Sequence, residues 1–151
     1  MNRVAASLVA LGVPEPRIRD FPNSTATAEQ AAAAIGAPVG SIVKSLLFMA
    51  GDKPILVLAS GANRVDTDRL RVLVGAPVKR ANADQVRHAT GFPIGGVPPI
   101  GHPSPLATYV DADLLQYDEV WASAGTPHSV FPIDTQTLIG ITHGHVADVR
   151  A

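Results

Sequence analysis

Two stretches of the sequence hold residues whose type and spacing could do chemistry, and the first is built around Lys44. This lysine stands alone in the apolar run 41–48, SIVKSLLF. Alternation along a strand places Lys44 on the same face as Ile42 and Leu46, and lysine is rarely buried. Its ammonium group therefore either snorkels to solvent at a strand end or points into a polar pocket.

The second stretch is the segment 91–102, GFPIGGVPPIGH, which packs four glycines and three prolines into twelve residues. Proline fixes φ and removes an N–H donor, whereas glycine accepts φ > 0 and lets another molecule approach the backbone closely. The residues between them are apolar instead of the Ser, Asn and Asp of an ordinary loop. We therefore expect a loop with a defined shape.

Other combinations of reactive residues point to no particular site. His143 and His145 could supply two metal ligands, but no third ligand has a telling spacing, so a solvated turn is favoured and we expect no metal and no cofactor. Asp111 and Asp113 stand at a strand-to-helix junction, where capping is the expected role. The sequence has no Walker loop, no Gly-x-Gly-x-x-Gly and no Gly-x-Ser-x-Gly motif. The absence of cysteine excludes disulfides, thiolate ligands and a cysteine nucleophile.

The charge pattern argues against a large nucleic-acid interface. Net charge is −1, from 12 Lys and Arg against 13 Asp and Glu, which argues against a protein that binds long nucleic acid by neutralising its phosphates. The cations are nevertheless concentrated between positions 64 and 87, where six of them face three acids: Arg64, Arg69, Arg71, Lys79, Arg80 and Arg87 against Asp66, Asp68 and Asp84. This is either a modest face for a few phosphates or an ordinary solvated surface.

The length of 151 residues, with 46% hydrophobic and 17% charged residues, is that of one ordinary domain with its own core. We treat residues 1–151 as a single domain. The apolar runs are shorter than the roughly 18 residues of a membrane span, and the N-terminal apolar patch lacks a clear signal-peptide cleavage site. The expectation is a soluble, cytoplasmic protein that does not enter a membrane.

The elements that must position these residues follow from local signals. Capping residues and glycine stops predict helices over 3–11, 27–35, 66–74, 82–89 and 134–141. Apolar runs between turn signals predict strands over 17–21, 41–50, 54–60, 78–80, 107–110, 119–124 and 129–133, with the turn 51–54 closing a hairpin. Hairpin strands mixed with short helices indicate an α+β fold with a mixed sheet.

Three motifs then carry a resemblance to a known family. The segments 42–47 (IVKSLL), 95–101 (GGVPPIG) and 119–125 (EVWASAG) occur in the order and spacing of the YbaK/prolyl-tRNA synthetase-associated domain family. That family comprises free-standing aminoacyl-tRNA deacylases and the editing insertion of bacterial prolyl-tRNA synthetases. The resemblance covers positions 4–149. It implies a curved mixed sheet, largely antiparallel and approaching a barrel, flanked by helices.

The resemblance also implies which residues form the site. Lys44 matches the family's signature lysine beside the 3′ end of the charged tRNA, and Gly95, Gly96, Val97 and Pro99 belong to its Gly-x-x-x-Pro loop. Further positions that match or lie near pocket residues of relatives are Phe21, Ser45, Ile100, Ser123 and His128. Among these, His128 lies in a turn whose length varies among relatives.

Hydrolysis of an aminoacyl ester needs an attacking water and donors for the developing oxyanion. The N–H groups of Gly96 and Val97, held rigid by Pro98 and Pro99, could supply those donors. Val97, Ile100 and Phe21 would exclude larger acyl groups, whereas a missing methylene costs only about 1–3 kcal/mol, so small wrong residues would enter. The residues offer no triad in order, and the resemblance implies that the substrate's own ribose hydroxyl assists the water.

The implied activity is deacylation of mischarged tRNA, with tRNA(Pro) carrying alanine, cysteine or a similar small residue as the expected substrate. Expected partners are the acceptor end of aminoacyl-tRNA, bound through Arg64, Arg69, Arg71 and Arg80, and prolyl-tRNA synthetase. We expect a monomer or a weak homodimer. Two other hypotheses stay open: a module that binds aminoacyl-tRNA or a synthetase without hydrolysis, and a proline-rich loop that serves as a ligand for a partner domain.

Overall fold

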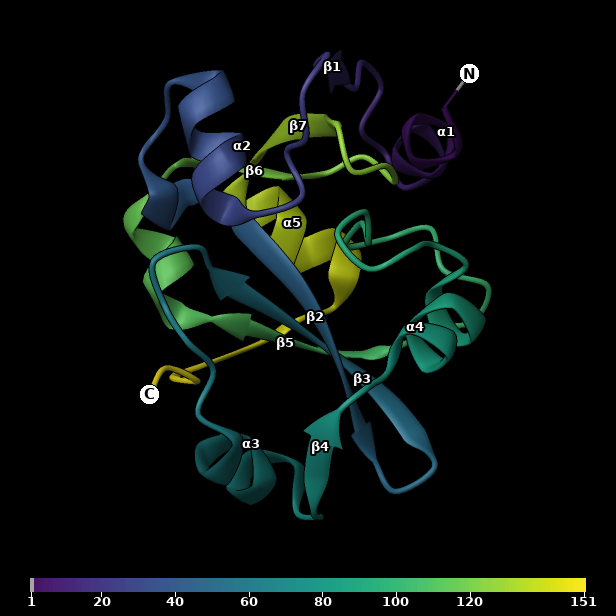
Figure 1. Cartoon of the computed structure of the whole chain (residues 1–151), viewed down its shortest axis with the longest axis vertical. Coiled ribbons are helices and arrows are strands. Elements are labelled where there is room, and N and C mark those ends of the chain that lie inside the picture. Colours follow the sequence, from purple (N-terminus) through teal and green to yellow (C-terminus); the bar gives the residue numbers. More distant parts are fainter. Residues whose placement is uncertain (1) are drawn as a thin grey trace.

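The computed structural model describes residues 2–151 and contains helices on both sides of β-structure, as Figure 1 shows. The α-helices are α1 (Arg3–Ala10), α2 (Ala28–Ile35), α3 (Thr67–Val74), α4 (Ala83–Thr90) and α5 (Thr135–Thr142). The strands are β1 (Arg19–Asp20), β2 (Val43–Ala50), β3 (Lys53–Ser60), β4 (Val78–Arg80), β5 (Ala107–Asp111), β6 (Glu119–Ser123), β7 (Ser129–Asp134) and β8 (His145–Ala147). Two short 3-10 helices, η1 (Val39–Ser41) and η2 (Ala112–Gln116), precede β2 and follow β5.

The predicted α+β class with a mixed, largely antiparallel sheet is confirmed, but the strands divide into two sheets that do not close into a barrel. One sheet has the order β1-β7-β6 and the other β4-β2-β3-β5-β8. All pairings are antiparallel except β3 with β5 and β5 with β8. A parallel bridge between Ile42 and Trp121 joins the two sheets.

Local sequence signals explain where the helices begin and end. The Thr27 hydroxyl accepts the Gln30 N–H while the Gln30 side chain accepts the Thr27 N–H, and Asn82 and Gln85 form the same capping box on α4. Gly36, Gly75 and Gly91 end α2, α3 and α4 in the left-handed conformation that favours glycine. The helices therefore lie close to their predicted positions.

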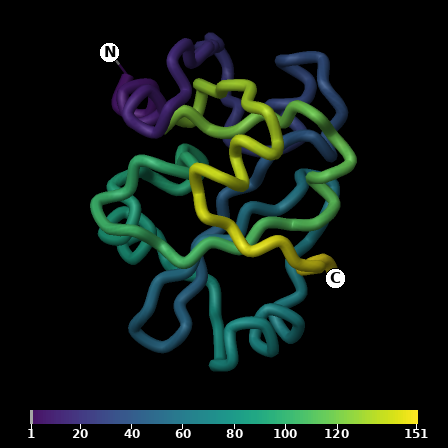
Figure 2. Tube along the Cα trace, turned by 180° about the vertical axis from the view of Figure 1, so that it is seen from behind, coloured from purple at the N-terminus to yellow at the C-terminus, as the bar shows by residue number. Residues whose placement is uncertain are grey.

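Several predicted strand limits are wrong at their ends. The strand expected over 17–21 contains only Arg19 and Asp20, and residues 39–41 form η1 before β2 begins at Val43. The region of His143 and His145 forms the end of α5 and the edge strand β8, which the sequence signals did not predict. In Figure 2 this C-terminal part of the chain, in yellow, crosses the back of the molecule.

The main core lies between the two sheets. Apolar side chains of β2, β3 and β5 meet those of β6 and β7, and α1, α4 and α5 add residues at the periphery. The glycine-proline loop of residues 91–102 contributes Phe92, Val97 and Ile100, each at most 6% exposed. Burial of these side chains explains why the loop is apolar, because each stabilises the packed state by about 1.5–3 kcal/mol.

No helix in residues 2–151 combines the length and the apolar character that crossing a membrane requires. A second apolar cluster under α3 covers the opposite face of the larger sheet. A third, small cluster fixes α2 through Ala28 and Ala31 against Ile42 and the partly buried Trp121. This contact places the N-terminus of α2 over the start of β2, where Lys44 lies.

Candidate functional site

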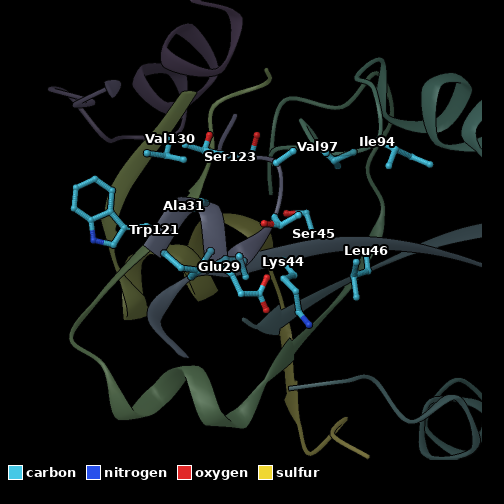
Figure 3. Close-up of a pocket in the computed structure, with 18 of the residues that line it drawn as sticks. Glu29, Ala31, Lys44, Ser45, Leu46, Ile94, Val97, Trp121, Ser123 and Val130 are labelled. Carbon is cyan, nitrogen blue, oxygen red and sulfur yellow. The ribbon is translucent and has the colours of Figure 1, made fainter. Parts of the chain in front are cut away.

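A cavity of about 330 Å³ opens between β2, the segment leading into α2, the glycine-proline loop and the strands β6 and β7. Figure 3 shows Trp121 and Val130 at one end of the cavity and Ile94 at the other, with Lys44, Ser45 and Glu29 between them. All three family motifs contribute to its walls, because β2, the loop and β6 meet here. The cavity is therefore the candidate site.

Lys44 lines this cavity from β2, together with Ile42 and Leu46. Its ammonium group donates a hydrogen bond to the main-chain carbonyl of Asn63. Burial lowers the pKa of the Lys44 ammonium from its ordinary value of 10.5. Of the two alternatives for this lysine, the structure therefore supports a polar pocket over an ammonium exposed at a strand end.

Nearby charges modify the effect of burial on the Lys44 pKa. Glu29 and Asp111 oppose the shift, whereas Arg80 and Arg64 add to it. Glu29 and Arg80 line the same cavity. The site thus concentrates positive charge and has one carboxylate at its wall within residues 2–151.

The Asn63 carbonyl, which accepts the hydrogen bond from Lys44, belongs to a loop that two carboxylates hold in place. The side-chain amide of Asn63 donates to Asp111 at 2.9 Å and to Asp113 at 2.7 Å. Asp111 is 1% exposed and also accepts the N–H of Ser60 at 3.0 Å. The predicted capping role of Asp111 is confirmed, since it also accepts the Asp113 N–H at the start of η2. Sequence reasoning missed Asn63, which no local motif marks.

Two serines line the cavity in different states. The Ser45 hydroxyl oxygen is buried and has no hydrogen-bond partner among the residues that the structure describes. Such a group is costly unless a water or a ligand satisfies it. The Ser123 hydroxyl instead accepts the Gly125 N–H at 3.2 Å. Ser45 is therefore the serine with free hydrogen-bonding capacity at the wall.

The glycine-proline loop reaches the cavity through Ile94, Gly95 and Val97. One predicted role needs correction: the N–H of Gly96 donates to the Pro93 carbonyl at 3.0 Å and is not available to an oxyanion. A Cβ at Gly96 would lie 3.0–3.2 Å from backbone atoms of Thr126, so this glycine permits close packing of the loop on the β6–β7 turn. Within residues 2–151 the Val97 N–H has no hydrogen-bond partner.

The loop is held from behind by His102. Its Nε2–H donates to the Pro98 carbonyl at 2.8 Å, which identifies the protonated ring nitrogen because a carbonyl can only accept. Burial lowers the pKa of the His102 imidazole, and the hydrogen bond to Pro98 partly opposes that shift. The neutral ring therefore fixes the part of the loop next to Val97.

Four predicted substrate-binding residues do not line this cavity. Ile100 is buried in the core, and both Ile100 and Pro99 border a separate hollow on the other side of the loop. The backbone N–H of Phe21 donates to the carbonyl of His128, and the His128 side chain is exposed. The Phe21 ring instead lies near the Arg19 guanidinium, 5.0 Å from ring centroid to Cζ.

The four arginines predicted to bind tRNA fall into two groups. Arg80 lines the cavity, with its guanidinium 5.5 Å from the ring centroid of Phe48, and the exposed Arg64 follows Asn63 near Lys44. Arg69 and Arg71 lie on α3 and form salt bridges of 2.7 and 3.1 Å with carboxylates. Arg64 and Arg80 are thus the cations best placed for a ligand in the cavity.

The lining restricts the chemistry that the cavity can support. No histidine lines it among the described residues, so the wall has no imidazole to deprotonate a serine. The groups that this lining offers include the Lys44 ammonium, the Arg80 guanidinium, the Glu29 carboxylate, the Ser45 hydroxyl and the Val97 N–H. This set suits a reaction that depends on positioning and charge stabilisation.

Comparison with known proteins also points to an editing domain. Residues 22–141 match the family described as the aminoacyl-tRNA editing domain. A crystal structure of a candidate trans-editing enzyme for prolyl-tRNA synthetase superposes with a TM-score of 0.95 and 46% identity, covering 99% of this chain and 95% of that one.

Two curated relatives cover most of the chain. The uncharacterized protein YwhH of Bacillus subtilis (strain 168) is 33% identical over 125 residues, which are 82% of this chain and 80% of the relative. A candidate Cys-tRNA(Pro)/Cys-tRNA(Cys) deacylase, EbsC of Enterococcus faecalis, is 26% identical over 126 residues, 82% of this chain and 76% of its own. Since the family match spans most of the described fold and all three motifs line one cavity, this chain belongs to the aminoacyl-tRNA editing domain family.

Proposed function

We propose that the protein hydrolyses the ester bond of mischarged aminoacyl-tRNA, and that its substrate is tRNA(Pro) carrying a small wrong amino acid such as alanine or cysteine. The observation that carries this proposal is the cavity wall itself, where Lys44, Ser45 with its unpartnered hydroxyl and Val97 with its unpartnered N–H line one volume of about 330 Å³. Membership of the editing family and the names of two relatives support the substrate class.

In this proposal the chain positions the ester and stabilises charge. The Val97 N–H donates to the oxyanion that forms when water attacks the ester carbonyl, and Lys44 acts by its positive charge on the ribose or the terminal phosphate. A hydroxyl of the terminal ribose assists the water, since the wall has no histidine within residues 2–151. Arg80 and Arg64 hold phosphates of the acceptor end.

The test is a panel of tRNAs incubated with the purified protein: alanyl-, cysteinyl-, seryl- and prolyl-tRNA(Pro), with alanyl-tRNA(Ala) for comparison. We expect alanyl- or cysteinyl-tRNA(Pro) to be deacylated and prolyl-tRNA(Pro) to be spared. Lys44→Met should reduce kcat by at least about 100-fold, the range for removing one preorganised electrostatic group.

The matched control is Lys79→Met, because Lys79 is an exposed lysine on β4 outside the cavity. It should keep the wild-type rate. Absence of hydrolysis with every ester would contradict the proposal, and tight binding without turnover would favour a non-catalytic aminoacyl-tRNA module. Equal loss of rate in both lysine variants would contradict the role assigned to Lys44.

A further inference from the structure

Cations outnumber carboxylates among the charged side chains that line the cavity. Lys44 and Arg80 supply two cations, and Glu29 is the one carboxylate that lines the cavity in the described part of the chain. Figure 3 shows Glu29 reaching down from α2 beside Lys44, with both charged ends toward the same volume. A ligand in this cavity therefore meets two cations and one carboxylate.

The local structure leaves the Glu29 carboxylate unused. The capping box of α2 consists of Thr27 and Gln30, so Glu29 takes no part in it. Within residues 2–151 the carboxylate has no hydrogen-bond partner within 3.5 Å and no salt bridge within 4.0 Å. The other acid near Lys44, Asp111, is fully engaged with Ser60 and Asn63. Glu29 is thus free to accept a donor from a ligand.

A helix-terminal role alone does not explain this carboxylate. An acidic residue in the first turn stabilises a helix by about 0.3–1 kcal/mol through the macrodipole. Asp84 occupies the equivalent position in α4, directly before the glutamine of the second capping box. Asp84 does not line the cavity. The two positions therefore share the helix contribution and differ in access to the site.

The proposed substrate brings a group that complements Glu29. Every aminoacyl ester carries a free α-amino group, whose pKa of roughly 7.7–8.0 in unperturbed α-amines leaves much of it protonated at neutral pH. Placing an ammonium near Lys44 and Arg80 without a counter-charge would be unfavourable. We propose that the Glu29 carboxylate binds the α-ammonium group of the aminoacyl ester and so restricts the site to esters with a free amino group.

Ser45 adds a second unsatisfied polar group to the lining of the cavity. Its buried hydroxyl oxygen has no hydrogen-bond partner within residues 2–151, and strand alternation directs it away from Lys44, as Figure 3 shows. The recognition of the amino group is therefore assigned to Glu29 alone. This inference rests on the proposed function, since it assigns the recognition of the same substrate.

The test measures binding separately from hydrolysis. The probe is an acceptor-stem minihelix ending in a 3′-amide analogue of the alanyl ester, which cannot be hydrolysed by ester cleavage, compared with the same minihelix N-acetylated on the alanyl group. The wild-type protein should bind the free-amino probe about 10- to 100-fold more tightly, the range for one charged hydrogen bond. Glu29→Gln should abolish this preference, and the matched variant Asp84→Asn should retain it.

The pH dependence of the binding preference distinguishes recognition of the amino group from a purely structural role of Glu29. The wild-type preference should diminish as pH rises above the pKa of the probe's amino group, and Glu29→Gln should show no such trend. In a kinetic arm, lactyl-tRNA(Pro), where a hydroxyl replaces the amino group, should be a poor substrate whose kcat/KM changes less than about 2-fold in Glu29→Gln, far below the loss expected for one charged hydrogen bond.

Each outcome decides something different. Equal wild-type affinity for the two probes would overturn the assignment, even if alanyl-tRNA is hydrolysed. A Glu29→Gln variant that loses rate equally on alanyl- and lactyl-tRNA would also overturn it, because Glu29 would then serve Lys44 or the water. Selective binding of the free-amino probe without any ester hydrolysis would support the role of Glu29 while contradicting the proposed deacylase activity.

Discussion

At the scale of single residues, Lys44 combines a functional assignment with a cost in stability. Burial lowers its pKa from 10.5, so the native state holds this proton less tightly than the unfolded chain does. Between the native pKa and 10.5 the unfolded state binds more protons, and stability contributed by Lys44 therefore rises with pH. Below that window the half-buried charge is present in full and opposes folding.

This sign leads to a prediction for Lys44→Met. At about pH 7 the variant should be at least as stable as the wild type, because it removes the burial of a charge. As pH rises toward 10.5, the wild type should gain stability relative to the variant. Urea midpoints at several pH values measure the difference. Lys79→Met, at an exposed position, should show a constant difference, and the same constant difference for Lys44→Met would contradict the buried charge.

At the scale of elements, the glycine-proline loop has one part that lines the cavity and another that packs into the core. Val97 lines the cavity, whereas Ile100 fills the core behind the loop. The sequence placed both side chains in one size filter, because alternation in an irregular loop does not say which side faces inward. Of the three residues predicted to act as a size filter, Val97 is the one that lines the cavity, and its effect on acyl size stays a prediction.

Val97→Ala should accordingly widen the acceptance of acyl groups. Each additional methylene that the cavity admits changes discrimination by about 1–3 kcal/mol, so kcat/KM for a larger acyl group relative to alanyl should rise on the order of 10-fold. Competition between alanyl- and a larger aminoacyl-tRNA(Pro) measures the ratio. Ile100→Val is the control, since it removes a core methylene at a cost of about 0.5–1.5 kcal/mol and should leave the ratio unchanged. A matching change in both variants would indicate general loosening of the loop.

Local signals predicted most elements, and tertiary contacts account for what they missed. The capping boxes at Thr27 and Asn82 and the hairpin of β2 and β3 follow from neighbours in the chain. The pairing of β1 with β7 joins segments that are distant in the sequence, so local signals could not show it. Lys44 could be identified because a cation in an apolar strand is unusual. Glu29 could not, because a glutamate in a first helical turn is ordinary until folding brings it to the cavity.

At the scale of the whole molecule, the charge distribution limits how tRNA is held. Net charge is −1, and within the described residues the cations that line the cavity or lower the pKa of Lys44 are Lys44 itself, Arg80 and Arg64. The arginines of α3 form exposed salt bridges, which contribute about 0–1 kcal/mol and hold them near carboxylates. We therefore expect a small footprint on the acceptor end.

Arg80→Glu should raise KM by about 10-fold or more with kcat little changed, because binding common to substrate and transition state is lost. Arg69→Glu and Arg71→Glu should raise KM less than Arg80→Glu does.

With about two to four phosphate contacts on a single strand, the slope of log kcat/KM against log salt should be about −1.5 to −3. A minihelix should be deacylated nearly as efficiently as whole tRNA. A slope of log kcat/KM against log salt near −6, or a minihelix that is not deacylated, would indicate a larger RNA interface.

In the part of the chain that the structure describes, the bridge between Ile42 and Trp121 is the one strand-like link between the two sheets that wall the cavity. Each sheet satisfies its own backbone hydrogen bonds through its ladders, so a small change in the spacing between the sheets breaks few of them. The spacing is instead set by the apolar side chains packed between the sheets, so the width of the cavity depends on core packing more than on either ladder. Substitutions that repack this seam are therefore expected to change which acyl groups fit, without rebuilding a strand.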